Sequence, residues 1–171
     1  MSPVLPPLAP DAASALPVIA TDLKAIDTMA VESFAVFCFA DVRPLFGAAQ
    51  VLDWRLSGRL SRALERGHVE GKGGEVVLLP GEGRNKRRRV FLFGLGEAAK
   101  ADRALMRGVV KNAFTCLAQA GARDAAFVAP AAGAKGELEA EFLQALAEEL
   151  SGQVRTVLVS PPPEPRAQKS H

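Results

Sequence analysis

The sequence predicts an α/β fold, a three-layer α/β/α sandwich around a mixed and largely parallel sheet. Short apolar runs alternate along the chain with longer segments in which apolar residues recur at helical spacing. Such alternation favours strands joined by helices that cover both faces of one sheet. One run, residues 33–40 (SFAVFCFA), is apolar on both of its faces, as a central strand of such a sheet is expected to be.

Six strands and three helices follow from these patterns. The apolar runs predict strands at 17–22, 33–40, 75–79, 90–93, 125–128 and 154–159. Helical spacing predicts helices at 45–66, 102–120 and 137–150. The first helix carries Asp53 and several arginines mostly on its polar faces. In the second, Asp102 is placed as the N-cap, Gly121 ends the helix, and the buried stripe is Leu105, Val109, Ala113 and Leu117.

Composition indicates a single globular domain between two extended ends. Of the 171 residues, 49% are hydrophobic and 23% charged, which is typical of soluble domains. Proline-rich segments predict a flexible leader at 1–16 and a flexible tail at 161–171, so the folded domain is expected at 17–160. No apolar run approaches the roughly 20 residues of a membrane span, and the leader lacks the basic start of a signal peptide.

The cysteines and histidines favour a cytoplasmic protein without a metal or cofactor. Cys38 and Cys116 both lie in apolar segments, which suits buried thiols in a reducing compartment. The spacing of metal-binding cysteine pairs is absent, and His68 and His171 lie far apart in the sequence. The formal net charge of +2 is too small to predict nucleic-acid binding for the chain as a whole.

The first candidate ligand loop follows the predicted strand at 90–93. Gly94, Gly96 and Ala99 have the spacing of a dinucleotide-binding fingerprint, in which glycines let the backbone approach a pyrophosphate. The next helix, however, starts several residues late, and Asp102 puts a negative charge where the phosphate would lie. A tight strand-to-helix turn that needs a positive φ is therefore favoured over a nucleotide site.

The second candidate ligand loop contains Gly71, Lys72, Gly73 and Gly74. Its Gly-Lys pair is shared with phosphate loops, but three residues instead of four separate Gly71 from the preceding Gly67. The hydroxyl residue that would hold magnesium is also missing after the lysine. A glycine-rich connection between a helix and a strand is favoured, with His68 exposed on the same loop and without a catalytic role.

A basic run between two predicted strands is a third candidate. Residues 84–89 hold five cations in six positions: Arg84, Lys86, Arg87, Arg88 and Arg89. Such a run is suited to phosphate contacts that weaken with salt. No aromatic residue lies among them to stack on a base, so a solvated turn that protects a strand edge is favoured over nucleic-acid binding.

The residues provide no active site. Neither cysteine has a histidine nearby in the sequence that would make it a thiolate. Ser57 and Ser61 lie on a predicted helix without the motif of a serine hydrolase. The glutamates of the last helix follow helical spacing, as a solvated face does. A peptidase must polarise a carbonyl and activate water, and the sequence contains no ligand cluster for a metal that does either.

Taken in order, several short motifs resemble the N-terminal domain of the leucyl (cytosol) aminopeptidase family. They are Leu52-Asp53, the segment 57–61 (SGRLS), the glycine loop 71–75 (GKGGE), Leu78-Leu79 and the basic-apolar strand end 88–96 (RRVFLFGLG). The resemblance covers roughly residues 17–160 and implies a fold similar to macro domains. It also implies that the metal ions and catalytic residues of the family belong to a longer C-terminal domain, to which no position of this chain corresponds.

The resemblance therefore implies a stand-alone, non-catalytic domain that acts as a binding or regulatory module. Its partner is expected to be a full-length aminopeptidase or another protein. Three alternatives remain open: a reader of ADP-ribose or another nucleotide through the two glycine loops, nucleic-acid binding through 84–89, and one half of a split metallo-aminopeptidase.

Overall fold

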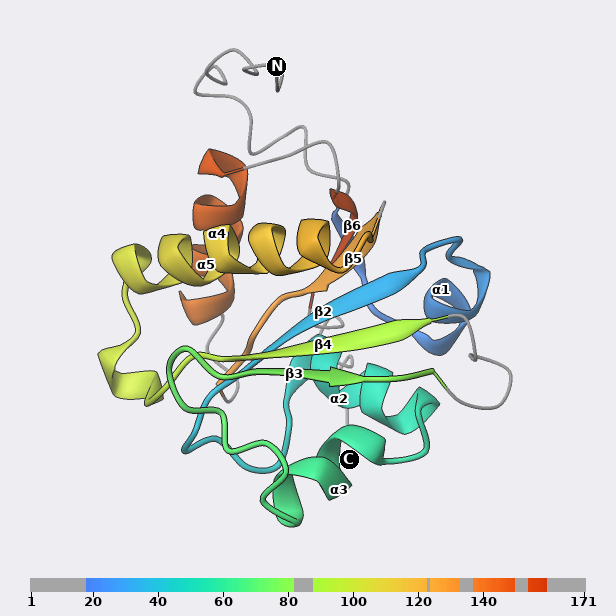
Figure 1. Ribbon diagram of the computed structural model, residues 1–171, viewed down its shortest axis with the longest axis horizontal. Coiled ribbons are helices and arrows are strands. Elements are labelled where there is room, and N and C mark those ends of the chain that lie inside the picture. Colours follow the sequence, from blue (N-terminus) through green and yellow to red (C-terminus); the bar gives the residue numbers. More distant parts are fainter. Residues whose placement is uncertain (1–17, 82–87, 123, 133–136, 150–153, 160–171) are drawn as a thin grey trace, which may run out of the picture.

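A computed structural model describes residues 18–81, 88–122, 124–132, 137–149 and 154–159 of the chain. These residues form one six-stranded sheet with helices packed on both faces (Figure 1). The predicted three-layer α/β/α class is confirmed. The expected leader and tail lie outside the described residues. None of the helices in the described ranges is long and apolar enough to cross a membrane.

The sheet has the strand order β1-β6-β5-β2-β4-β3. Every neighbouring pair is parallel except β3 with β4, which is antiparallel, so the predicted mixed and largely parallel sheet is confirmed. All six residues of β2 are buried, in agreement with a central strand. The strands are β1 (Val18–Ala20), β2 (Ser33–Cys38), β3 (Val76–Leu79), β4 (Arg89–Gly94), β5 (Ala125–Val128) and β6 (Val154–Val159).

The helices divide into two layers. The helical elements are α1 (Leu23–Thr28), α2 (Gly47–Arg55), α3 (Arg59–Glu65), the 3-10 turn η3 (Ala98–Lys100), α4 (Arg103–Gln119) and α5 (Glu137–Glu148). Helices α4 and α5 cover one face of the sheet, and α1, α2 and α3 cover the other (Figure 1). Side chains of β2 alternate between the two cores: Phe37 packs under α4 and α5, whereas Phe34 and Val36 pack under the other layer.

The prediction of one helix over 45–66 is wrong, because the helix is interrupted between the end of α2 and the start of α3. Ser57 and Gly58 both have positive φ, at 56° and 76°. The Asp53 carboxylate, which was expected on a polar face, is 7% exposed and accepts hydrogen bonds from the backbone of Leu60 (2.8 Å) and Ser61 (3.3 Å). It therefore caps the first turn of α3, and this local partner stabilises two short helices over a continuous one.

The other differences are smaller. Helix α1 and η3 were not predicted, since six and three residues are too few to show a helical period. In α4 the N-cap is confirmed, with Asp102 accepting from the Leu105 amide at 2.8 Å. Its buried stripe is shifted at the start, where Met106 and Val110 are buried in place of Leu105 and Val109. Cys116 is half-buried instead of buried, because it lies beside that stripe.

The loop before β3 packs directly against the end of β4. A Cβ atom placed on Gly94 would lie 1.9 Å from the Lys72 carbonyl oxygen, and one on Gly71 would lie 2.7 Å from the Phe39 carbonyl oxygen. Only glycine permits backbones to approach so closely. The contact fixes the glycine loop 71–74 against the carboxyl ends of β2 and β4.

Replacing Gly94 therefore tests this packing. Gly94→Ala is expected to lower the free energy of unfolding by about 3 kcal/mol, the upper part of the usual cost of overpacking, because the methyl group meets backbone atoms that cannot rotate away. Gly108→Ala is the matched control. Gly108 lies within α4 with nothing within 4 Å of an added Cβ, so its replacement is expected to stabilise by up to about 1 kcal/mol. Urea unfolding measures both, and equal stability of Gly94→Ala and the wild type would contradict the packing.

Candidate ligand site

The two glycine loops, distant in the sequence, meet at the carboxyl ends of β2 and β4. The Leu95 amide donates to the Cys38 carbonyl at 2.9 Å, and the Gly96 amide donates to the Gly71 carbonyl at 2.8 Å. Gly96 has a φ of 77°, which confirms the predicted turn with positive φ. Ligands of open α/β sheets commonly bind at such carboxyl ends. This edge is therefore the candidate ligand site.

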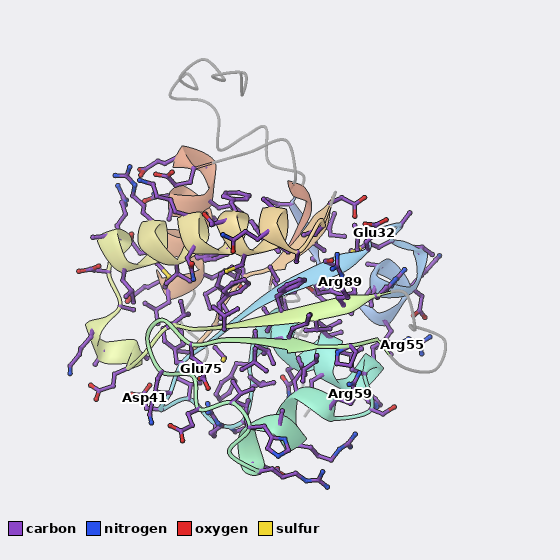
Figure 2. The ribbon with its side chains drawn as sticks, in the orientation of Figure 1. Glu32, Asp41, Arg55, Arg59, Glu75 and Arg89 are labelled. Carbon is purple, nitrogen blue, oxygen red and sulfur yellow. The ribbon has the colours of Figure 1, made fainter. Side chains whose placement is uncertain are left out.

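The Glu75 carboxylate already occupies the amides of the second loop. It accepts hydrogen bonds from the backbone N–H groups of Glu70 (3.0 Å), Gly71 (2.7 Å) and Lys72 (3.2 Å). Successive amides that point at one position form a nest, the backbone arrangement that binds phosphates and other anions. Figure 2 shows Glu75 at the same end of the sheet as Asp41, opposite the end that carries Arg89. The anion in this nest is part of the chain itself.

The lysine of this loop is also engaged within the chain. The Lys72 ammonium forms an ion pair with the Glu70 carboxylate. The pKa of Lys72 is raised, first by its hydrogen bond to Glu70 and then by the charge of that carboxylate. Because Lys72 is exposed, this pair contributes little to stability. The ammonium group of Lys72 and the amides of the loop are therefore both bound by neighbouring glutamates of the chain.

An open cavity of about 430 Å³ adjoins the nest. Its walls are largely apolar, and Gly94, Ala104 and Gly108 leave room in it because they are small. Glu75 is the one charged residue among those that line it, so a phosphate group placed there would face a like charge. The lining residues are Gly74, Glu75, Phe93, Gly94, Ala104, Leu105, Gly108, Val109 and Asn112.

Carboxylates also meet the amides that follow the first glycine loop. Asp41 accepts from the Ala98 amide at 2.9 Å at the start of η3, and Asp102 caps α4. The late start of the helix after Gly96 is thereby confirmed. Neither Asp41 nor Glu75 is among the site residues predicted from the sequence. A carboxylate within a glycine run is a local signal that would have indicated Glu75, whereas Asp41 lies 57 positions from the amide it binds.

The described part of the basic run is used within the fold. Because side chains alternate along a strand, Arg88 and Arg89 point to opposite layers. Arg88 donates to the carbonyls of Ile26 (2.9 Å) and Met29 at the end of α1, and Arg89 donates to the Ala120 carbonyl (2.8 Å) at the end of α4. Each guanidinium therefore donates hydrogen bonds to carbonyl groups at the C-terminal end of one helix. Arg84, Lys86 and Arg87 lie outside the described residues, so nucleic-acid binding through this run stays a prediction.

The thiols and acidic groups that the structure describes form no reactive cluster. Burial raises the pKa of Cys38 to about 11, with Glu75 adding to the rise and Arg43 opposing it, so its thiol stays protonated at neutral pH. His68 is exposed, as predicted. Glu141 and Glu148 of α5, and Glu149 directly after it, form ion pairs with cations of α4. Within the described ranges no three His, Cys, Asp or Glu residues lie together as ligands for a metal ion.

Sequence comparison relates the chain to one family. The model of the N-terminal domain of the cytosol aminopeptidase family matches residues 35–153. A probable cytosol aminopeptidase of Stutzerimonas stutzeri (strain A1501) is 39% identical over 92 residues, which are 54% of this chain and 18% of that protein. Another, of Alkalilimnicola ehrlichii, is 33% identical over 129 residues, 75% of this chain and 26% of that protein. The chain thus spans about a fifth to a quarter of the length of these relatives.

Structural comparison agrees with the predicted fold. A mutant of tomato leucine aminopeptidase superposes with a TM-score of 0.55 at 17% identity, covering 87% of this chain and 34% of the tomato protein. The macrodomain of Thermus aquaticus DarG superposes with a TM-score of 0.53 at 15% identity, covering 84% of this chain and 98% of that domain. At these identities the likeness establishes the fold alone. Because the family model covers most of the chain, the chain belongs to the cytosol aminopeptidase family and corresponds to its N-terminal domain.

Proposed function

We propose that this chain is a non-catalytic member of the family, which acts in the cytoplasm as a binding or regulatory module. The observation that carries the proposal is the Glu75 carboxylate in the amide nest, with Asp41 and Asp102 on the neighbouring amides. The backbone groups that would hold a reacting anion are bound by the chain's own carboxylates. Such a site stabilises a scaffold and offers no oxyanion hole to a substrate.

The chemistry of the family supports the same proposal. Amide hydrolysis needs groups that polarise the carbonyl and activate water, and metal ions do this in metallopeptidases. The described residues bring no three potential ligands together, and Cys38 is held as a buried thiol. The chain matches the N-terminal domain and spans a minor share of its relatives. A full-length aminopeptidase or another protein is the proposed partner.

A peptidase assay tests the proposal. The purified full chain is expected to release no product from leucine p-nitroanilide in the presence of Mn²⁺ or Zn²⁺, because its described residues bring together no ligand set for either ion. A full-length aminopeptidase of the family, assayed in parallel, serves as the positive control. Turnover that rises in proportion to the chain and disappears with a chelator would show that the chain is an enzyme.

A reader of ADP-ribose is the second candidate. Two observations favour it: the glycine loops lie side by side at the carboxyl ends of the strands, and the fold is similar to a macrodomain. Fold similarity alone does not transfer a ligand. The charge of Glu75 opposes this candidate, since a diphosphate would have to displace a carboxylate that accepts from three amides.

Calorimetry with ADP-ribose separates the two candidates. The wild type is expected to give no binding heat at millimolar ligand, because Glu75 fills the nest and repels phosphate. Glu75→Ala removes that anion, and Glu70→Ala is the matched control, which removes the partner of Lys72 but leaves Glu75 in place. Circular dichroism first establishes that both variants are folded. Saturable heat from the wild type would favour the reader over the non-catalytic module.

A further inference from the structure

The outer surface of α2 and α3 holds an exposed aromatic side chain. Trp54, the one tryptophan of the sequence, is 75% exposed in the last turn of α2. Exposed tryptophan side chains are costly in water and are enriched where proteins bind one another. The Trp54 carbonyl accepts from the Ser57 amide at 2.9 Å, so the residue lies at the joint between the two helices.

Arginines extend from this joint along α3. Arg59, Arg62 and Arg66 are spaced at i, i+3 and i+7, which places them on one stripe of the helix. Leu60, Ala63 and Leu64 form the buried side. Figure 2 shows Arg55 and Arg59 on this helical layer. Arg59 donates to the Pro80 carbonyl at 2.7 Å and is engaged within the chain, so Trp54, Arg62 and Arg66 alone are called the α3 surface below.

Within the described residues, the charges of Arg62 and Arg66 are not neutralised in the way that other cations of the protein are. Arg62 donates to the Ser57 carbonyl at 2.6 Å, a contact that orients the guanidinium and leaves its charge in place. Within the part of the chain that the structure describes, no ion pair includes Arg62 or Arg66. On α4 the matching cations Arg103 and Arg107 are paired with glutamates of α5, and Arg55 is paired with Asp27.

We infer that the α3 surface binds an acidic segment of a partner protein, with Trp54 as the apolar anchor and the arginines as carboxylate ligands. The inference rests on the proposed function as a binding module and adds the chemistry of the partner. Charge complementarity selects the anion, because an oriented guanidinium binds a carboxylate through two parallel hydrogen bonds. Tryptophan and arginine are also the residues that contribute most to protein interfaces.

The same observations favour a protein partner over a single-stranded nucleic acid. Proteins that bind single strands stack successive bases on several aromatic side chains along a basic groove. Among the described residues, Trp54 is the one aromatic side chain among the large exposed apolar groups, and the others are aliphatic. One exposed indole at the joint before α3 and two arginines along that helix provide an anchor and a rim, which suits a peptide segment.

Fluorescence of Trp54 provides the test. The full chain is titrated at low salt with a synthetic peptide of glutamates interrupted by leucines, which contains no tryptophan or tyrosine. Binding is expected to shift the emission of Trp54 to shorter wavelength, because the leucines cover the indole, and to weaken as salt rises, because the arginine contacts are screened. Absence of any binding at low salt overturns the inference.

Variants of the chain test whether the peptide binds at the α3 surface. Calorimetry with the same peptide is expected to show about a tenfold loss of affinity for Trp54→Ala, as for an interface anchor. The double variant Arg62→Glu and Arg66→Glu is expected to lose at least about tenfold, because it reverses two charges that face the peptide. Lys100→Glu is the matched control, since it reverses an exposed cation on η3, and it is expected to leave the affinity unchanged.

The outcomes separate this inference from the proposed function. Equal losses in the Lys100→Glu control would mean that net charge alone attracts the peptide, which overturns the α3 surface. Tighter binding of oligothymidylate than of the peptide, lost in Trp54→Ala, would assign the surface to nucleic acid and would also overturn the inference. Neither result bears on the peptidase assay, which tests the non-catalytic proposal by itself.

Discussion

The Glu75 carboxylate in its amide nest, together with the close contact at Gly94, is the constraint on which this end of the molecule depends. The carboxylate holds the amides of 70–72, and the Lys72 carbonyl then lies against Gly94 with no room for a side chain. Loop 71–74 is thus joined to β4, and β4 to the centre of the sheet. The same bonds that fix the loop also occupy the amides that a free anion would need, so one arrangement bears on both the fold and the proposed function.

The motifs that relate the chain to its family have structural roles wherever the structure describes them. Asp53 caps α3, Arg88 and Arg89 bind the ends of helices in opposite layers, and Gly94 admits the loop. Each of these contacts joins elements that are separated in the sequence or that meet at a turn. The signature therefore identifies a scaffold, and it carries no information about a substrate. The likeness in sequence to cytosol aminopeptidases is for this reason compatible with described residues that bring no three potential metal ligands together.

Most of the fold, and little of the site, follows from the sequence alone. Strands such as β5 (Ala125–Val128) and the cap of α4 at Asp102 depend on neighbours in sequence, so local patterns predict them. The break after α2 was missed because helical spacing continues through it, while the deciding bond joins Asp53 to Leu60 across the turn. The basic run was interpreted as a solvated turn, yet Arg89 contacts a carbonyl 31 positions away. Contacts of that separation arise from topology, which periodicity does not describe.

The two ends of the parallel strands differ in how their charges are used, and this difference bears on where the protein acts. At the carboxyl ends, carboxylates of the chain accept hydrogen bonds from backbone amides, so these amides are already bound within the chain. On α3, Arg62 is oriented by the Ser57 carbonyl and keeps its charge, and the exposed Trp54 lies at the joint that precedes this helix. A cation that forms no ion pair among the described residues retains its attraction for an anion of a partner. On the proposed function, a binding module whose ligand edge is occupied by its own carboxylates gains more from contacts on its helical layer than at the edge where folds of this kind usually bind ligands.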